Sequence, residues 1–230
     1  AIPVSAAAYV EQGVTYAPLR ALLNALGNWQ VWWDGEAGQA AAISGSASLR
    51  ADPAGNVIRL NGIALSGRVT VESGVTYVPL RLVCEALGCK VEWDPYLGGA
   101  AVTSPGAAYD AVELYWLSRI IYAESGAESM TGQIAVGNVI LNRMESSRFP
   151  NTVEGVIFDR KDAVQFEPVS NGQIYKTPSA QSMEAARRVL NGENVIGSAL
   201  YFYAPALSQG VWINASCTYQ QTIGCHRFYL

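Results

Sequence analysis

The sequence predicts an α+β protein built from two domains. Three observations predict it: an internal repeat within the first 104 residues, a short turn-rich segment after it, and a second half in which helical patterns precede short strands. At 230 residues, each half is long enough to bury its own core. We therefore expect a first domain at 1–104 and a second at 105–230.

The N-terminal half contains a duplication. QGVTYAPLRALLNALG at 12–27 recurs as SGVTYVPLRLVCEALG at 73–88, and QVWWD at 30–34 recurs as KVEWD at 90–94. In each copy a tight turn joins two strands, a proline occupies the first turn of a helix, and a glycine ends that helix. A strand bearing tryptophan comes next, so we expect a small domain made of two β-β-α-β units.

A linker at 103–106, Thr-Ser-Pro-Gly, separates the halves. Beyond it, Asp110 or a neighbour opens a helix, and a second helix capped by Ser129 or Thr131 runs through GQIAVGNVILNRM. Further on, the pattern predicts a short capped helix within 150–158, a helix capped by Thr177 that closes at Asn191-Gly192, and two strands, 199–205 and 222–230, that could pair.

Glu124 is the residue that points most directly to chemistry. Leu117, Ile120 and Ile121 precede it at helical spacing, so all four side chains project from the face that a helix buries. A carboxyl at the end of an apolar stripe loses hydration, which raises its pKa and allows it to hold a proton near neutral pH. Such a group can act as a general acid, although a glutamate near a helix end is more often a solvated surface residue.

Composition argues against several kinds of partner. Lys and Arg total 15 against 19 Asp and Glu, without a basic cluster, so nucleic acid is not expected. No apolar run approaches the roughly 18 residues that a membrane span needs. The chain has one histidine, His226, whereas zinc peptidases and copper sites need several imidazoles, so we expect no metal and no other cofactor.

The four cysteines form two close pairs, Cys84 with Cys89 and Cys217 with Cys225. Such pairs indicate local disulfides and an oxidising compartment, although four cysteines allow three pairings. Cys217–Cys225 is favoured because a separation of eight residues can close a hairpin-like loop. We therefore expect a secreted protein, whose targeting signal has been removed or was never included.

The VTYxPLR and WD residues of each repeat carry a first resemblance. With them, the N-terminal half resembles the repeat of copper amine oxidase N-terminal-like domains, which often accompany secreted bacterial wall proteins. No histidine precedes His226, so the resemblance implies no copper here. It implies a spacer or a wall-binding domain, and a spacer is favoured.

Five motifs of the second half carry another resemblance: YAESGAE at 122–128, GQIAVGNVILNR at 132–143, FPNTVEGVIF at 149–158, ALYFYAP at 199–205 and TIGCHRFY at 222–229. With them, the chain from about Leu114 to Leu230 resembles the cell-wall hydrolase family of spore cortex-lytic enzymes. The resemblance implies a lysozyme-like fold that cleaves peptidoglycan glycan strands between N-acetylmuramic acid and N-acetylglucosamine. It implies Glu124 as the catalytic acid, action in the cell wall or the spore cortex and coat, and a wall or spore protein as a regulatory partner.

The chain departs from the family pattern at two places. Ser125-Gly126-Ala127 stands where an arginine is more usual, which alters the sugar subsite around the acid, and Ala204 stands where asparagine usually precedes the proline. The second change removes one polar contact to substrate.

Glycoside cleavage needs an acid, and ordinary hydrolases add a second carboxylate. Glu128 lies beyond a helix break at Gly126, and Asp162 and Glu167 lie in a polar loop, so none stands out as the partner of Glu124. A lytic transglycosylase needs one acid, because the 6-hydroxyl of the sugar attacks the anomeric carbon and leaves a 1,6-anhydro product. We therefore expect a lytic transglycosylase, with an ordinary hydrolytic muramidase as an alternative.

Further side chains are candidates for lining the substrate groove: Ser125, Glu128, Gln133, Asn142, Gln165, Phe166, Tyr201, Tyr203 and His226. Gln133 and Asn142 could equally satisfy buried backbone groups. Tyr201 and Tyr203 share one strand face and could contact a sugar, although tyrosines also fill cores. For His226 a structural hydrogen bond is favoured over a catalytic part.

Two other functions compete with this one. A thiol peptidase could use Cys225 and His226, but adjacent residues on a strand point to opposite faces and would not pair. A wall-binding protein without catalysis is suggested by Ala204 and opposed by the presence of Glu124.

Overall fold

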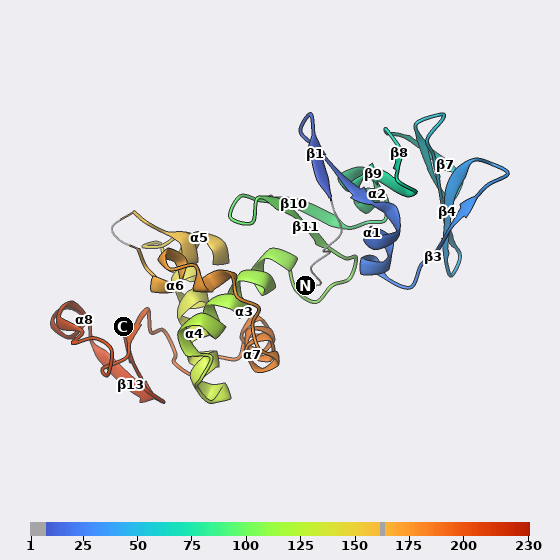
Figure 1. The fold of residues 1–230 in the computed structure, drawn as a ribbon. Helices are drawn as coiled ribbons and strands as arrows, with labels where there is room; N and C mark the ends of the chain where they lie inside the picture. Colours follow the sequence, from blue (N-terminus) through green and yellow to red (C-terminus); the bar gives the residue numbers. More distant parts are fainter. Residues whose placement is uncertain (1–7, 162–163) are drawn as a thin grey trace. The chain divides into compact units, whose positions relative to one another are not determined.

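The computed structural model describes residues 8–161 and 164–230 and divides between Ala107 and Ala108 into two compact units. Figure 1 shows strands with short helices in the first unit, and helices with a small sheet in the second. Both units mix helices and strands, which confirms the α+β class. Within the described ranges, no helix has the length and apolar character that crossing a membrane requires.

In the first unit a strand–strand–helix–strand order occurs twice. It runs as β1 (Tyr9–Glu11), β2 (Val14–Pro18), α1 (Leu19–Leu26) and β3 (Gln30–Asp34), and again as β8 (Thr70–Glu72), β9 (Val75–Pro79), α2 (Leu80–Ala86) and β10 (Lys90–Asp94). Both residues of each hairpin turn, Gln12-Gly13 and Ser73-Gly74, have positive φ, as type I′ turns require. Pro18 and Pro79 do not lie in the first helical turn as expected. Each occupies the N-cap position, as the last residue of the preceding strand, because its ψ angle, 120° or 113°, is extended and not helical.

The two hairpins meet at the centre of a four-stranded sheet, ordered β1-β2-β9-β8. In the antiparallel pairing of β2 with β9, Ala17 lies opposite Val78, its counterpart in the other copy. The flanking pairs exchange in the same way: Tyr16 with Pro79, and Pro18 with Tyr77. The register therefore reads the same from either copy, so the two hairpins are related by an approximate two-fold axis.

The two copies differ after their tryptophan strands. Beyond β3 come β4 (Gln39–Ser44), β5 (Ala47–Asp52), β6 (Val57–Leu60) and β7 (Ile63–Ser66), and these five strands form an antiparallel sheet in sequence order. Beyond β10 comes β11 (Gly99–Thr103), which pairs with β10. One apolar core joins both copies, and Leu23, Ile58 and Val78 are fully buried in it.

Two helices form the centre of the second unit. The Asp110 carboxylate caps α3 (Ala111–Ser125), and the Ser129 hydroxyl caps α4 (Met130–Glu145). Helix α4 is buried on nearly every side. A β-carbon at Gly137 would lie 2.8 Å from Ile121 Cδ1 and 2.9 Å from Val189 Cγ2, so this glycine allows neighbouring helices to approach closely.

Four shorter elements pack against this pair: α5 (Val153–Phe158), α6 (Glu167–Ser170), the 3₁₀ turn η1 (Gln173–Tyr175) and α7 (Ala180–Leu190). A fifth, α8 (Val211–Ser216), lies apart from the pair in Figure 1. Thr152 caps α5, inside the expected segment. Helix α7 starts later than expected, because the hydroxyl of Ser179, and not that of Thr177, accepts the N–H of Ser182. It ends at Asn191 as predicted.

A small antiparallel sheet of β12 (Tyr201–Tyr203), β13 (Tyr219–Ile223) and β14 (His226–Tyr229) completes the unit, in the order β12-β14-β13. The pairing of β12 with β14 confirms that the segments 199–205 and 222–230 pair. The second segment is not one strand, however, because a turn at Gly224-Cys225 divides it. The sequence does not predict β13, whose residues YQQTI lack an alternating apolar pattern.

All four cysteines are free thiols in the structure. The expected Cys217–Cys225 disulfide is wrong, because β13 lies between the two residues. A strand of five residues spans about 17 Å, whereas a disulfide joins Cα atoms within about 7 Å. The side chains of Cys84 and Cys89 do share a hydrogen bond at the end of α2.

Candidate active site

Helix α3 presents Glu124 at its C-terminal end. On the same helical face, Leu117, Ile120 and Ile121 are fully buried, which confirms the predicted apolar stripe. Glu124 itself is half-buried. Its carboxyl therefore stands at the edge of the core of the second unit.

Two effects raise the pKa of the Glu124 carboxyl to about 7. The larger effect is burial, which removes water from the charged form. The second is the negative charge of Glu167, the first residue of α6. At neutral pH the carboxyl is therefore divided about equally between acid and ionised forms, the condition in which one group can both give and take a proton.

Glu167 is one of the two loop carboxylates considered as partners for Glu124. The structure places it close enough for its charge to act on Glu124, and it is exposed to solvent. The other carboxylate, Asp162, lies outside the described residues. Of these two carboxylates, Glu167 is therefore the one that the structure describes, and it is the candidate for the second carboxylate of a hydrolytic reaction.

Helix α3 ends at Ser125, one residue after Glu124. The Gly126 N–H donates to the Tyr122 carbonyl at 3.0 Å, and a β-carbon at Gly126 would lie 2.5 Å from that oxygen. Glu128 then lies in a turn, with its N–H donating to the Ser125 carbonyl at 2.8 Å. Glu128 therefore does not continue the helix of Glu124, as the sequence predicted.

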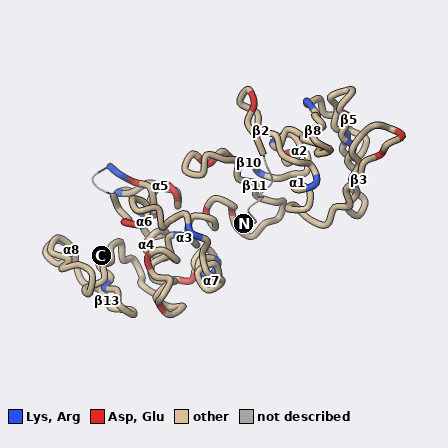
Figure 2. The backbone as a smooth tube through the Cα atoms, viewed as in Figure 1, with Lys and Arg blue, Asp and Glu red and all other residues tan. Residues whose placement is uncertain are grey.

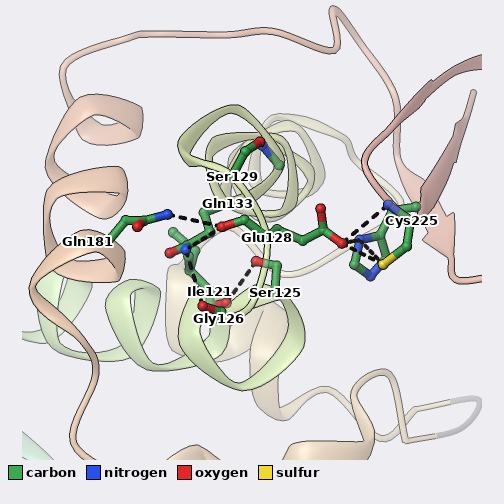
Figure 3. A network of polar contacts seen from close by, with 10 residues as sticks. Ile121, Ser125, Gly126, Glu128, Ser129, Gln133, Gln181 and Cys225 are labelled. Atoms are coloured by element: carbon green, nitrogen blue, oxygen red, sulfur yellow. Dashed lines mark hydrogen bonds and ion pairs between the residues drawn. The ribbon is translucent and has the colours of Figure 1, made fainter.

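Two glutamines fix this turn, as Figure 3 shows. Gln133 Nε2, from α4, donates to the Glu128 carbonyl at 3.1 Å, and Gln181 Nε2, from α7, donates to the same oxygen at 3.0 Å. Gln133 Oε1 accepts the Ser182 hydroxyl at 2.7 Å, in a fully buried contact. The backbone just beyond the acid is thus tied to two helices.

The Glu128 side chain extends to the turn between β13 and β14 (Figure 3). Its Oε1 accepts the Cys225 N–H at 3.2 Å and the Cys225 thiol, and it lies 3.9 Å from His226 Nδ1. The thiol hydrogen bond lowers the pKa of Glu128, and the same bond raises the pKa of Cys225. Burial lowers the pKa of His226, so its ring is neutral at neutral pH.

This cluster bears on the possibility of a thiol peptidase. Cys225 lies in a turn and not on a strand, and its Sγ is 3.9 Å from His226 Nδ1. The expectation that the two side chains point apart is therefore wrong. The raised pKa of Cys225 nevertheless keeps the thiol protonated at neutral pH, which is its unreactive form.

Among the residues that the structure describes, Glu128, Cys225 and His226 form a group whose side chains could hold a metal ion. One donor atom each from Glu128, Cys225 and His226 lies within 4.8 Å of the others. Oxygen, sulfur and nitrogen together form a donor set that zinc accepts. The hydrogen bond from the thiol to the carboxylate already pairs two of the three groups with each other.

Three of the predicted groove residues hold backbone in place. Ser125 is 3% exposed and its hydroxyl donates to the Ile121 carbonyl at 2.8 Å, so this hydrogen is not free to bond a sugar. Gln133 is fully buried. Asn142 Nδ2 donates to the carbonyls at positions 197 and 199, both at 2.8 Å. These contacts match the structural role left open for Gln133 and Asn142.

Arg143 lies at the end of α4. It was not among the groove residues predicted from the sequence, yet it contacts several of them. It is 5% exposed, and its Nη1 donates to Gln165 Oε1 at 3.3 Å. Its guanidinium lies 5.3 Å from the ring centre of Phe166 and 5.4 Å from that of Tyr201. Burial lowers its pKa to about 10, so it remains charged at neutral pH. The signal in the sequence was a lone basic residue in a helix that is otherwise apolar on nearly every side.

The two tyrosines of β12 are half-buried, and both hydroxyls have partners. The guanidinium of Arg148 donates to the Tyr201 hydroxyl, and Asn214 Nδ2 donates to the Tyr203 hydroxyl at 2.9 Å. A sugar would therefore meet their exposed ring surfaces more readily than their hydroxyl groups. His226 is 5% exposed, and its ring packs against Phe202, with ring centres 5.3 Å apart, besides contacting Glu128 and Cys225.

Comparison with known proteins gives the same division into two halves. Residues 127–229 match the cell wall hydrolase family, in a match that begins just after Glu124, and residues 1–105 match the copper amine oxidase N-terminal domain. A spore cortex-lytic enzyme of Bacillus cereus is 40% identical over 105 residues, which cover 46% of this chain and 39% of that enzyme. The spore cortex-lytic enzyme of Bacillus subtilis is 36% identical over 113 residues, covering 49% of this chain and 36% of that enzyme.

Among solved structures, the catalytic domain of the germination-specific lytic transglycosylase SleB from Bacillus anthracis is 37% identical in sequence. The match covers 54% of this chain and 98% of that domain, with a TM-score of 0.49. For both curated enzymes, the matched segment spans less than half of their length.

Proposed function

Because its C-terminal half is a cell wall hydrolase domain, joined to a copper amine oxidase N-terminal domain in its N-terminal half, we propose that this chain cleaves the glycan strands of peptidoglycan. The bond cut joins N-acetylmuramic acid to N-acetylglucosamine. The observation that carries the proposal is Glu124, a half-buried carboxyl with a pKa of about 7 at the end of α3. Relatives named spore cortex-lytic enzymes support the spore cortex or the cell wall as the site of action.

The reaction is a lytic transglycosylation. Protonated Glu124 gives its proton to the glycosidic oxygen, and the bond from that oxygen to the anomeric carbon breaks. The 6-hydroxyl oxygen of the same muramic acid then bonds to the anomeric carbon, and its proton passes to the Glu124 carboxylate. The acid is restored, no water is consumed, and the product carries a 1,6-anhydro ring. A pKa of about 7 suits both proton transfers.

Ordinary hydrolysis is the second candidate, and one observation favours it. Glu167 lies close enough to raise the pKa of Glu124, and hydrolases pair an acid with a second carboxylate. In that reaction Glu167 would activate water or attack the sugar. Because Glu167 is exposed, it lacks the restraint that positions Glu124, and we place it second.

The substrate groove comprises the predicted side chains that keep accessible surface near the end of α4 and on β12: Gln165, Tyr201 and Tyr203. Phe166 and His226 support it from beneath, since they are 3% and 5% exposed. Glu128 ties the turn after the acid to the β13–β14 hairpin. Ser125, Gln133 and Asn142 keep the backbone in position.

The finer features of the fold belong to the same proposal. The second domain, 105–230, is lysozyme-like, which is supported by an acid at a helix end whose following turn is hydrogen-bonded to a small antiparallel sheet. The first domain, 1–104, is a duplicated β-β-α-β unit, which is supported by the repeated element order and the symmetric register of β2 with β9. A secreted protein with a regulatory wall or spore partner fits this activity.

The test is to digest purified peptidoglycan, with and without muramic lactam, using the wild type and Glu124→Gln. We expect soluble anhydro-muropeptides from the wild type, and a rate at least about a hundredfold lower from the variant, in the range that general acids contribute. Preference for the lactam-containing substrate would assign the enzyme to spore cortex. Equal activity of the two proteins would remove Glu124 from the mechanism.

A further inference from the structure

The first unit contains two grooves with matching walls. One groove, of about 510 Å³, is lined by Arg20 and Trp33 of the first copy and by Val71 and Thr76 from the hairpin of the second. The other, of about 830 Å³, is lined by Arg81 and Trp93 of the second copy and by Val10 and Thr15 from the hairpin of the first. Each of these four residue types recurs at the equivalent position in the other groove. The exchange of hairpins results from the symmetric pairing of β2 with β9.

Exposed indoles distinguish these grooves from ordinary surface depressions. Trp33 is 48% exposed and Trp93 is 52% exposed. The neighbouring position has diverged, with Trp32 in one copy and Glu92 in the other, whereas the tryptophan at the groove is present in both. Other apolar side chains at the grooves are exposed as well: Trp32, Val71 and Val75 beside Trp33, and Val10 and Val14 beside Trp93. Exposed apolar surface gathered in one place marks a binding site, whereas single exposed residues do not.

Both grooves also have the same polar support. Arg20 donates to the Val31 carbonyl at 3.1 Å, and Arg81 donates to the equivalent carbonyl of Val91 at 2.8 Å. The guanidinium is therefore fixed to the tryptophan strand in each copy. Each groove combines a flat indole with hydrogen-bond donors in a space of several hundred Å³, the size of ordinary ligand sites.

Sugar rings fit this combination. A pyranose has an apolar face of C–H groups that packs on an aromatic ring, and hydroxyl groups at its edge that meet arginine and threonine side chains. Residues of both signs are interspersed along this unit, as Figure 2 shows. In the groove of Trp93, Arg68 and Arg81 are balanced by Glu85 and Glu92, and Arg20 is the charged residue that lines the groove of Trp33. Neither groove therefore carries a strong net charge, which favours a largely uncharged ligand over a highly charged one. Two grooves of the same chemistry suit a polymer that repeats the same unit.

We propose that Trp33 and Trp93 mark two equivalent glycan-binding grooves, which hold the peptidoglycan strands that the second domain cleaves. The choice of peptidoglycan rests on the proposed function, because the grooves alone indicate only a glycan. Binding at both grooves raises the effective concentration of the enzyme on an insoluble polymer. The first domain is then a wall-binding domain and not a spacer.

The experiment measures binding of the full chain to insoluble peptidoglycan. All proteins carry Glu124→Gln, so that the wall is not degraded during the assay. Trp33→Ala, Trp93→Ala and the double variant are compared with Tyr96→Ala, since Tyr96 is a 39% exposed aromatic residue of the same unit that lines neither groove. Circular dichroism checks that each variant is folded.

We expect each tryptophan variant to bind about three- to tenfold more weakly, the double variant to lose about the product of these factors, and Tyr96→Ala to bind as its parent does. Soluble N-acetylglucosamine oligomers should change the tryptophan fluorescence of the parent more than that of the double variant. Unchanged binding by the folded double variant, or an equal loss in Tyr96→Ala, would overturn the proposal. The lytic activity of Glu124→Gln is compared with that of the wild type in a separate assay. The activity assay therefore tests the proposed function, and the binding assay tests the two grooves.

Discussion

The Glu124 carboxyl combines partial burial with the nearby negative charge of Glu167, and both raise its pKa. Cleavage needs the protonated form, which disappears as pH rises through about 7. We expect kcat/KM to fall about tenfold per pH unit above that value. This fall is measured as a pH profile of fragment release from peptidoglycan. A rate that stays constant to about pH 9 would contradict the role of Glu124 as the acid.

Glu167→Gln is the matched control for the pH profile. Removing the negative charge removes one cause of the raised pKa, so the falling limb should move to lower pH while the maximum rate changes little. If Glu167 were instead the second carboxylate of a hydrolase, the variant would lose activity at every pH. The two mechanisms therefore differ in the shape of one profile.

The raised pKa of Glu124 also affects stability. A carboxyl whose pKa is higher in the folded state loses stabilising free energy as pH rises from about 4.5 to about 7. The full shift corresponds to about 3 kcal/mol, which partial exposure reduces to about 1 to 2 kcal/mol. We expect Glu124→Gln to be more stable than the wild type by this amount at about pH 8, and similar at about pH 4. Urea unfolding at both pH values tests it, and a variant less stable at about pH 8 would contradict it.

The residue scale also shows how far the sequence could predict the site. The position of Glu124 at the end of a buried apolar stripe was predictable, because that stripe depends on neighbours on its own helix. The role of Arg143 was not predictable, because the residues that it contacts, Gln165, Phe166 and Tyr201, come from other segments of the chain. The sequence marks Arg143 as a lone basic residue in an apolar helix, but it does not reveal these partners.

At the scale of elements, the turn after the acid depends on two glutamines of different burial. Gln133→Ala leaves the buried Ser182 hydroxyl without its acceptor and removes one donor to the Glu128 carbonyl, so we expect a loss of about 1 to 3 kcal/mol in unfolding free energy. Gln181 is exposed and donates to the same carbonyl, so Gln181→Ala should cost less than about 0.5 kcal/mol. Denaturant unfolding compares them, and equal losses would show that the buried contacts do not fix the turn.

The end of α2 gives a prediction about disulfides. The Cys84 and Cys89 side chains are in contact, whereas β13 separates Cys217 from Cys225. If the protein is oxidised, we expect the disulfide between Cys84 and Cys89, with Cys217 and Cys225 remaining as thiols. Peptide mapping under non-reducing conditions reads the pairing, and a Cys217–Cys225 bridge would contradict the structure.

Helix starts with local capping chemistry were predictable, as Asp110 and Ser129 show. The start of α7 was not predicted correctly. Thr177 and Pro178 form a capping signal two residues before Ser179, which is the residue that caps the helix. The turn at Gly224-Cys225 was missed because the strand before it lacks an alternating pattern. Elements set by neighbouring residues were therefore predicted better than those set by tertiary pairing.

At the scale of the whole molecule, the repeat predicted a first domain of two similar units, and the motifs of the second half indicated the cell wall hydrolase family that matches residues 127–229. The sequence could not show that the two hairpins would meet in one sheet, because β2 and β9 lie far apart in the chain. That pairing places each hairpin beside the tryptophan strand of the other copy. The matching grooves are thus a consequence of long-range assembly.

The central claim is that Glu124 cleaves a glycan without using water. Its most direct test is to digest peptidoglycan in water enriched in the heavy oxygen isotope and to weigh the muropeptide ends by mass spectrometry. We expect the wild type to release 1,6-anhydro ends that carry no heavy oxygen, and Glu124→Gln to release almost none. Reducing ends that carry the heavy isotope would contradict the claim and would show hydrolysis, for which Glu167 is the described candidate for the second carboxylate.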